Sequence, residues 1–156
     1  ELMRLASASR SSKSIEEFAL GPVAGVAAMA LGDWSAADIA RLLGLVLGSE
    51  AASSSTGGGR FATRASFALP GRLKDLDDQQ LVDLAGATRS AAQCRPLFEV
   101  TLDALAARVD GLSPTQLLAL AEATIPLDPE HEVGGRVLQC WERLLDGAGP
   151  GGRGDA

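Results

Sequence analysis

An internal repeat of 36 residues constrains the fold of this chain more than any other feature. When the sequence is shifted by 36 positions, residues 76–111 align without a gap over residues 112–147. A period of this length is typical of stacked helical hairpins, in which each unit buries its apolar face against the next. We therefore predict an all-α fold, a short α-solenoid of about three stacked hairpins. The ten identical pairs are Leu76/Leu112, Gln80/Gln116, Leu81/Leu117, Leu84/Leu120, Ala85/Ala121, Ala87/Ala123, Thr88/Thr124, Leu102/Leu138, Asp110/Asp146 and Gly111/Gly147.

Local signals predict that each unit begins with a short helix. Ser113, followed by Pro114 and Gln116, supplies an N-cap, a proline at the first helical position and the glutamine of a capping box. The preceding unit has Asp77 as its N-cap and Gln80 in the equivalent place. The residues that follow have helical spacing and predict one buried face. They are Leu81, Leu84, Ala85 and Thr88 in one unit and Leu117, Leu120, Ala121 and Thr124 in the other.

A second helix is predicted in each unit, after a break at residues 89–96 or 126–129. Both units end in Asp-Gly, and Gly111 and Gly147 are suited to the left-handed residue that closes many helices. The second helix carries an apolar seam with helical periodicity. The two seams are Phe98, Leu102, Leu105 and Val109, then Val133, Val137, Trp141 and Leu144.

The same pattern extends towards the N-terminus with lower fidelity. Ser35 can cap a helix with apolar residues at positions 39, 42, 43 and 46, and residues 61–73 would form its partner. The Gly- and Ser-rich residues 48–59 between them predict a mobile loop. The repeats thus cover residues 34–147, with hairpins at 34–75, 76–111 and 112–147. Outside them we expect a flexible segment at 1–14, a lone helix or degraded hairpin at 15–33 and a disordered Gly-rich tail at 148–156.

Charge is distributed unevenly along the chain. Residues 1–74 carry eight Lys/Arg against six Asp/Glu, whereas residues 75–156 carry six against fourteen, a net charge of -8. Because an acidic half repels phosphate, a free-standing, non-specific nucleic-acid binder is disfavoured. The exception is a basic strip, Arg60, Arg64, Arg72 and Lys74, which contains no acid. These four side chains are candidate contacts to RNA or to an acidic partner, or form a solvated face balanced by Asp75, Asp77 and Asp78.

Two further segments bear on the class of protein. The apolar run from Phe18 to Leu31 is too short and too rich in small residues to span a bilayer. We therefore expect that this protein does not span a membrane. Cys94 and Cys140 lie 46 residues apart without zinc-site spacing, which leaves buried or partly exposed thiols, or a disulfide, as the alternatives.

The remaining motifs give no positive support for an enzyme. Residues 56–60 (TGGGR) resemble a phosphate-binding loop only loosely, because no Gly-Lys-Ser/Thr follows. His131 is the only histidine and lies among acidic residues, but no second His or Cys completes a metal site. Acidic residues there are explained by the dipole of the helix that follows. We therefore predict no catalytic residues, no metal and no cofactor.

The sequence of residues 112–123, with its counterpart at 76–87, resembles the first helix of organellar helical-hairpin repeats. These are the octotricopeptide and heptatricopeptide repeats and the arrays of RAP-domain and FAST-kinase-like proteins. The resemblance covers roughly residues 34–147 and is strongest in the last two units. It implies an α-solenoid in a mitochondrion or chloroplast that binds RNA or is built into a large assembly. Residues 2–14, rich in Arg and Ser without an acid, are similar in composition to an organellar transit peptide, and equally to a solvated tail.

From these observations we expect a non-catalytic structural subunit of an organellar ribonucleoprotein. The mitochondrial ribosome is the first candidate, with docking on rRNA through residues 60–74, on ribosomal proteins, or on both. The alternatives are an accessory subunit of a respiratory or photosynthetic membrane complex and a fragment of an organellar RNA-processing factor.

Overall fold

The computed structural model describes residues 19–125 and 132–147, and every regular element within them is a helix. The predicted all-α fold is therefore confirmed. The segments 1–14 and 148–156 and His131 lie outside the described residues. In chain order the elements are α3 (Gly21–Ala27), η2 (Leu31–Asp33), α4 (Ala36–Leu47), α5 (Glu50–Ser54), α6 (Thr56–Ala68), η3 (Pro70–Asp75), α7 (Asp78–Thr88), η4 (Ala92–Cys94), α8 (Arg95–Ala106), η5 (Val109–Gly111), α9 (Pro114–Thr124) and α10 (Glu132–Gly147), where η denotes a 3-10 helix.

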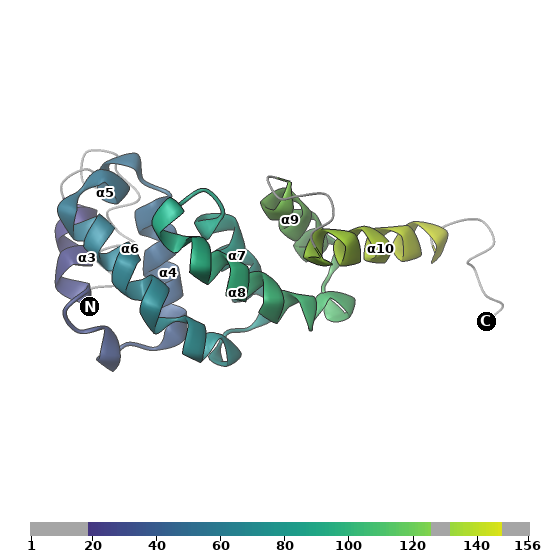
Figure 1. Ribbon diagram of the computed structural model, residues 1–156, viewed down its shortest axis with the longest axis horizontal. Coiled ribbons are helices and arrows are strands. Elements are labelled where there is room, and N and C mark those ends of the chain that lie inside the picture. The colour runs from purple at the N-terminus through teal and green to yellow at the C-terminus, as the bar shows by residue number, and fades with distance from the viewer. Residues whose placement is uncertain (1–18, 126–131, 148–156) are drawn as a thin grey trace.

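The helices form two layers (Figure 1). In the first layer, α4, α7 and α9 pack side by side in chain order. In the second layer, α6, α8 and α10 each pack against the first helix of their own unit. α3 precedes the hairpins and packs chiefly against α6. The molecule is elongated from α3 to α10 (Figure 1), an arrangement compatible with the expected solenoid of three hairpins.

Side-chain caps begin the first helices where the sequence predicts them. The Asp77 carboxylate accepts from the Gln80 backbone N–H at 2.8 Å, and the Gln80 side-chain oxygen accepts from the Asp77 backbone N–H at 2.9 Å. Ser113 and Gln116 make the same reciprocal pair at 3.2 and 2.9 Å. Ser35 caps α4 through its hydroxyl oxygen. Both predicted capping boxes are thus confirmed.

One hydrophobic core runs between the two layers. In α7 all four predicted core positions are buried, and in α9 so are Leu117 and Leu120. The α8 seam is buried from Phe98 to Leu105, and Val109 continues it in η5. In the last hairpin Val137 is buried and Trp141 packs against the core, whereas the side chains of Val133 and Leu144 are outside the described set.

The prediction of a mobile loop at residues 48–59 is wrong, because this segment contains α5 and the start of α6. Ser49 caps α5 by accepting from the Ala52 N–H at 3.2 Å, and Ser55 caps α6 by accepting from the Gly58 N–H at 3.0 Å. A composition that suggests flexibility therefore supplies two helix starts, since Ser is a good N-cap.

The glycines at the start of α6 allow helices to approach closely. A Cβ at Gly57 would collide with the carbonyl oxygen of Gly21 in α3, and a Cβ at Gly58 would collide with that of Ala52 in α5. The Gly-rich sequence that loosely resembles a phosphate loop is therefore used for backbone packing.

Two smaller expectations also change. Neither Gly111 nor Gly147 closes its helix in the left-handed conformation: no glycine with positive φ occurs in the described residues, Gly111 ends η5, and Gly147 lies within α10. The partner helix expected at 61–73 is α6, which ends at Ala68 and is followed by the 3-10 turn η3. Of the segment 15–33, residues 19–33 are described, and they contain α3, with Pro22 in its first turn, and η2.

Candidate interaction surfaces

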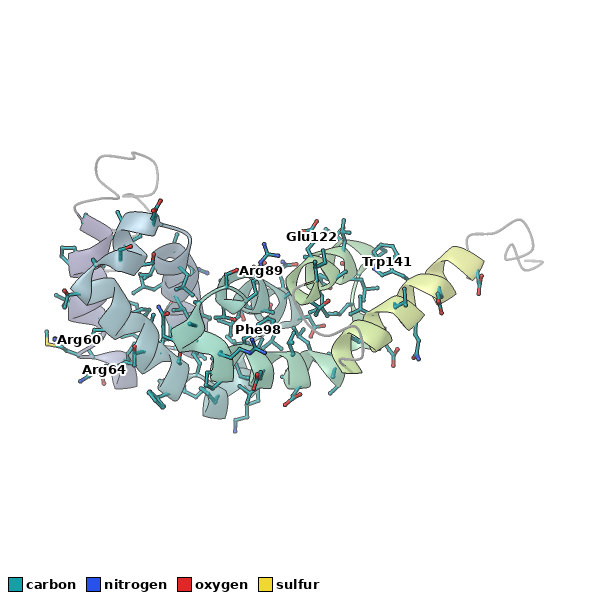
Figure 2. The ribbon with its side chains drawn as sticks, turned by 45° about the horizontal axis from the view of Figure 1, so that its top comes forward. Arg60, Arg64, Arg89, Phe98, Glu122 and Trp141 are labelled. Atoms are coloured by element: carbon teal, nitrogen blue, oxygen red, sulfur yellow. The ribbon has the colours of Figure 1, made fainter. Side chains whose placement is uncertain are left out.

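The four cations of the basic strip are divided between two elements. Arg60 and Arg64 lie in α6, whereas Arg72 and Lys74 lie in η3. Figure 2 shows Arg60 and Arg64 at the end of the molecule opposite Trp141. Arg60, Arg64 and Lys74 are exposed, and Arg72 is half-buried. The four cations therefore do not form one continuous row on a single helix.

Two of the four cations also bond to the protein backbone. Arg64 donates from Nη1 to the carbonyl oxygen of Ala28 at 2.8 Å, which joins α6 to the end of α3. Arg72 donates from Nη2 to the carbonyl oxygen of Trp34 at 2.7 Å. These bonds give Arg64 and Arg72 a structural role, so that Arg60 and Lys74 are the candidates for contact with a partner.

Arg72 has an equivalent one repeat later. Arg108 donates from Nη1 to the carbonyl oxygen of Leu76 at 3.0 Å and also contacts the Asp78 carboxylate at 3.1 Å. Trp34 and Leu76 each precede the N-cap residue of a first helix. Each arginine thus ties the end of a second helix back to the start of its own hairpin.

A groove crosses the first layer of helices. It has a volume of about 620 Å³ and is lined by residues of α4, α7 and α9. Nearly half of its lining residues are Ala or Gly: Ala37, Ala40, Gly44, Gly86, Ala87, Ala119 and Ala123. A Cβ added at Gly44 or Gly86 would meet nothing within 4 Å. The small lining leaves room for a segment of a binding partner to lie across the three helices.

Charges of both signs line the same groove. Arg41 and Asp83 come from α4 and α7, Arg89 directly follows α7, and Glu122 comes from α9. Arg89 donates to the carbonyl oxygen of Glu122 at 2.8 Å, and Figure 2 shows these two residues as neighbours. A mixed lining of this kind suits a polypeptide, which carries charges of both signs, better than a phosphate backbone.

Cys94 is a free, buried thiol at the start of α8. Burial raises the pKa of this thiol, and a hydrogen bond with Ser66 opposes that shift. A thiol that is buried and protonated is a poor nucleophile. Of the alternatives left open for the cysteines, Cys94 is a buried thiol that packs like a small hydrophobic residue. The side chain of Cys140 is outside the described set.

The structure adds two observations on the other candidate sites. Among residues 19–125 and 132–147, no three His, Cys, Asp or Glu side chains are grouped so that they could hold a metal ion. Within the same part of the chain, no helix has both the length and the apolar character that crossing a bilayer requires. The acidic residues around His131 fall largely in the segment 126–131, which is not described.

Comparison with known proteins gave no match, whether against family models, curated proteins or solved structures.

Sequence reasoning did not find the groove. Its lining residues are ordinary helix residues, and only the relative placement of α4, α7 and α9 brings them together. A usable signal does exist, because Gly44 and Gly86 each lie nine positions after the N-cap of their own helix, Ser35 and Asp77. A glycine at the same register position of two amphipathic helices lowers helix propensity in both, which marks that surface as a candidate interaction site.

Proposed function

We propose that this protein is a non-catalytic structural subunit of an organellar ribonucleoprotein, docking on ribosomal proteins, on RNA or on both. The mitochondrial ribosome is the first candidate assembly, and a chloroplast is the alternative location. The observation that carries the proposal is the groove across α4, α7 and α9. Stacked helical hairpins use such extended concave surfaces to bind other macromolecules.

Both the shape and the charge of the groove support a polypeptide as its occupant. Ala and Gly lining lets a partner's backbone or helix approach closely, and charges of both signs can fix its register. RNA contact is assigned to a separate surface, the exposed side chains of Arg60 and Lys74 at the α6–η3 edge. The net charge of -8 over residues 75–156 favours basic protein surfaces as neighbours of the other edges.

The test is co-sedimentation of the full chain with organellar ribosomal particles, with and without nuclease. We expect co-sedimentation that nuclease abolishes. Retention in a detergent-solubilised membrane complex after nuclease would instead support the accessory-subunit alternative. Association with free precursor RNA but not with particles would support the RNA-processing alternative.

A groove-filling variant links this test to the structure. Gly44→Gln combined with Gly86→Gln places two long side chains in the groove without a steric clash, because both Cβ positions face open space. Gly71→Gln, at an exposed position in η3 that does not line the groove, is the matched control. We expect the double variant to lose co-sedimentation at unchanged Tm and the control to retain it. Equal co-sedimentation of both variants would exclude the groove as the docking surface.

The RNA contact has its own measurement. If Arg60 and Lys74 neutralise phosphates, Arg60→Ala and Lys74→Ala each make the negative slope of log K against log salt shallower by roughly 0.7–0.9. A slope unchanged in both variants would remove RNA from the list of direct contacts.

A further inference from the structure

The last hairpin exposes large apolar side chains at the end of the stack. Leu118 is 52% exposed and Ile125 78% exposed, on or just after α9, and Leu138 of α10 is 60% exposed. Exposed apolar groups that cluster with polar neighbours commonly mark interaction sites. We call this surface the end face and define it by residues 118, 122 and 125 at α9 and residues 138, 142 and 146 of α10, spaced to share one side of each helix.

The equivalent positions of the preceding hairpin are covered. Val82 lies 36 residues before Leu118 and is 2% exposed, and Leu102 lies 36 residues before Leu138 and is fully buried. The residue type is similar or identical at both positions. The burial of Val82 comes from the packing of α9 on α7. Leu102 belongs to the seam by which α8 joins the core, whereas in α10 Val137 and Trp141 take that place, so Leu138 is exposed because the buried register is shifted by one residue.

α9 covers the face of α7 that contains Val82. Gln79 lies one turn before Val82, and its side-chain oxygen accepts from the Gln116 amide at 3.3 Å. Arg89 lies two turns after Val82 and bonds to the backbone of α9. Since residues at this spacing share one helix face, Val82 lies between two bonded contacts to α9. The middle hairpin thus uses this face to receive a helical hairpin.

From this equivalence we propose that the end face is a docking surface for a helical hairpin of a partner protein. The first helix of the partner packs along α9 through small apolar side chains, as α9 packs along α7. The flanks of that helix are basic, because the described charged side chains on the end face, Glu122, Glu142 and Asp146, are all exposed acids. The outer face of a terminal capping repeat is normally polar, whereas three of the six positions that define this face are large apolar residues.

Neither residues 148–156 nor a second copy of this chain is the favoured occupant. Residues 148–156 contain no Leu, Ile, Val, Met or aromatic residue and cannot supply an apolar helix face. A two-fold contact between two end faces would place Glu122, Glu142 and Asp146 of one copy near the same acids of the other. A head-to-tail contact between copies would be heterologous and, unless it closed into a ring, would propagate as an open filament.

This inference rests on the proposed function, docking in a larger assembly, and gives the protein a second docking surface. The end face shares only Glu122 with the groove. Its test inserts a probe hairpin, a copy of residues 112–147, between Gly147 and Ala148 of the full chain. The insertion continues the 36-residue period, so that the probe can stack on the end face. In the probe copy, position 119 is changed to Lys or to Glu. Ala119 and Gly86 both line the groove, and Glu122 is the equivalent of Gly86 one repeat later, so we expect position 119 of a stacked probe to lie on the same side as the Glu122 carboxylate.

We expect the probe with Lys to raise Tm by roughly 5 °C over the unmodified chain and the probe with Glu to raise it less. Leu118→Asp with Leu138→Asp in the native third hairpin should abolish the rise. Phe67→Asp is the matched control, because Phe67 is 82% exposed on α6, away from the end face. The control should retain the rise. The proposal is overturned by no rise, by a rise that survives the leucine substitutions, or by a probe with Glu that stacks as well as the probe with Lys.

Sedimentation of the unmodified chain completes the test. We expect a monomer, and a dimer that Leu138→Asp dissociates would make a second copy the occupant and overturn the proposal. The outcome is separable from that of the proposed function. Failure to co-sediment with ribosomal particles leaves the stacking result intact, and failure to stack leaves the groove-dependent docking intact.

Discussion

Arg72 and Arg108, which lie 36 residues apart, make the same bond in successive hairpins. Each donates from its guanidinium to the carbonyl oxygen of the residue before a helix N-cap, Arg72 to Trp34 at 2.7 Å and Arg108 to Leu76 at 3.0 Å. The 36-residue repeat therefore preserves this arginine–carbonyl hydrogen bond as well as the apolar positions. We call each such bond an arginine joint, and each can be tested separately.

Removing an arginine joint should cost measurable stability. Arg108→Ala loses the bond to Leu76 and the contact to Asp78, and we expect about 1–2 kcal/mol less free energy of unfolding in urea, with a similar loss for Arg72→Ala. Arg95→Ala is the control, because the Arg95–Glu99 pair is exposed on one helix and should contribute at most about 0.5 kcal/mol. Equal losses of unfolding free energy in all three variants would mean that an arginine joint stabilises the fold no more than an exposed ion pair does.

The helix caps should make separate contributions. Ser113→Ala and Asp77→Ala each remove the acceptor of a capping box, and we expect each to lower the free energy of unfolding by about 1 kcal/mol. Thr115→Ala, at an exposed position in the first turn of α9, should change it by less than about 0.5 kcal/mol. Urea titrations followed by circular dichroism measure all three, and a neutral Ser113→Ala would contradict the capping geometry.

Adjacent glycines in α6 should respond to substitution with opposite signs. Gly58→Ala forces a methyl group against the Ala52 carbonyl and should destabilise the protein by about 1–3 kcal/mol. Gly59→Ala meets its nearest neighbour at 4.0 Å, and should stabilise α6 by about 0.5–1 kcal/mol through helix propensity. A matched pair of thermal melts decides the point. Gly58→Ala as stable as the wild type would mean that α5 does not approach α6 as described.

The buried thiol predicts a pH dependence at the alkaline side. Because burial raises the folded-state pKa of Cys94 above its unfolded value, the protonated form stabilises the fold at lower pH. That contribution is fully present below about pH 9 and is lost as pH rises through the folded pKa. Cys94→Ala should remove this part of the alkaline loss of stability.

A labelling experiment checks the same thiol independently. In a Cys140→Ser background, we expect a thiol reagent to modify Cys94 only after denaturant is added. Rapid modification of the native variant at neutral pH would show that Cys94 is accessible.

The sequence predicted the parts of this fold that local rules determine. Asp77 and Ser113 begin their helices as expected because an N-cap and its glutamine partner lie within four residues of each other. The α8 seam is buried because helical periodicity survives in any packed hairpin.

The failures occurred where tertiary contacts decide. Residues 48–59 are helical although they are rich in Gly and Ser, because Gly57 and Gly58 are needed for contact with α3 and α5. The predicted helix 61–73 includes Pro70, although the residue before a proline is a favoured helix boundary. α6 ends at Ala68, before Pro70. The groove depends on three helices that are distant in sequence, and no local rule places them side by side.

The arginine bonds between elements have one further consequence, which concerns how such a chain can change over evolutionary time. Arg64, Arg72, Arg89 and Arg108 all donate to main-chain oxygens, those of Ala28, Trp34, Glu122 and Leu76. A main-chain acceptor is present whatever side chain the residue carries, so the acceptor positions are free to mutate as long as the donor stays. Hairpins joined in this way can drift far apart in sequence while keeping the geometry of their joints.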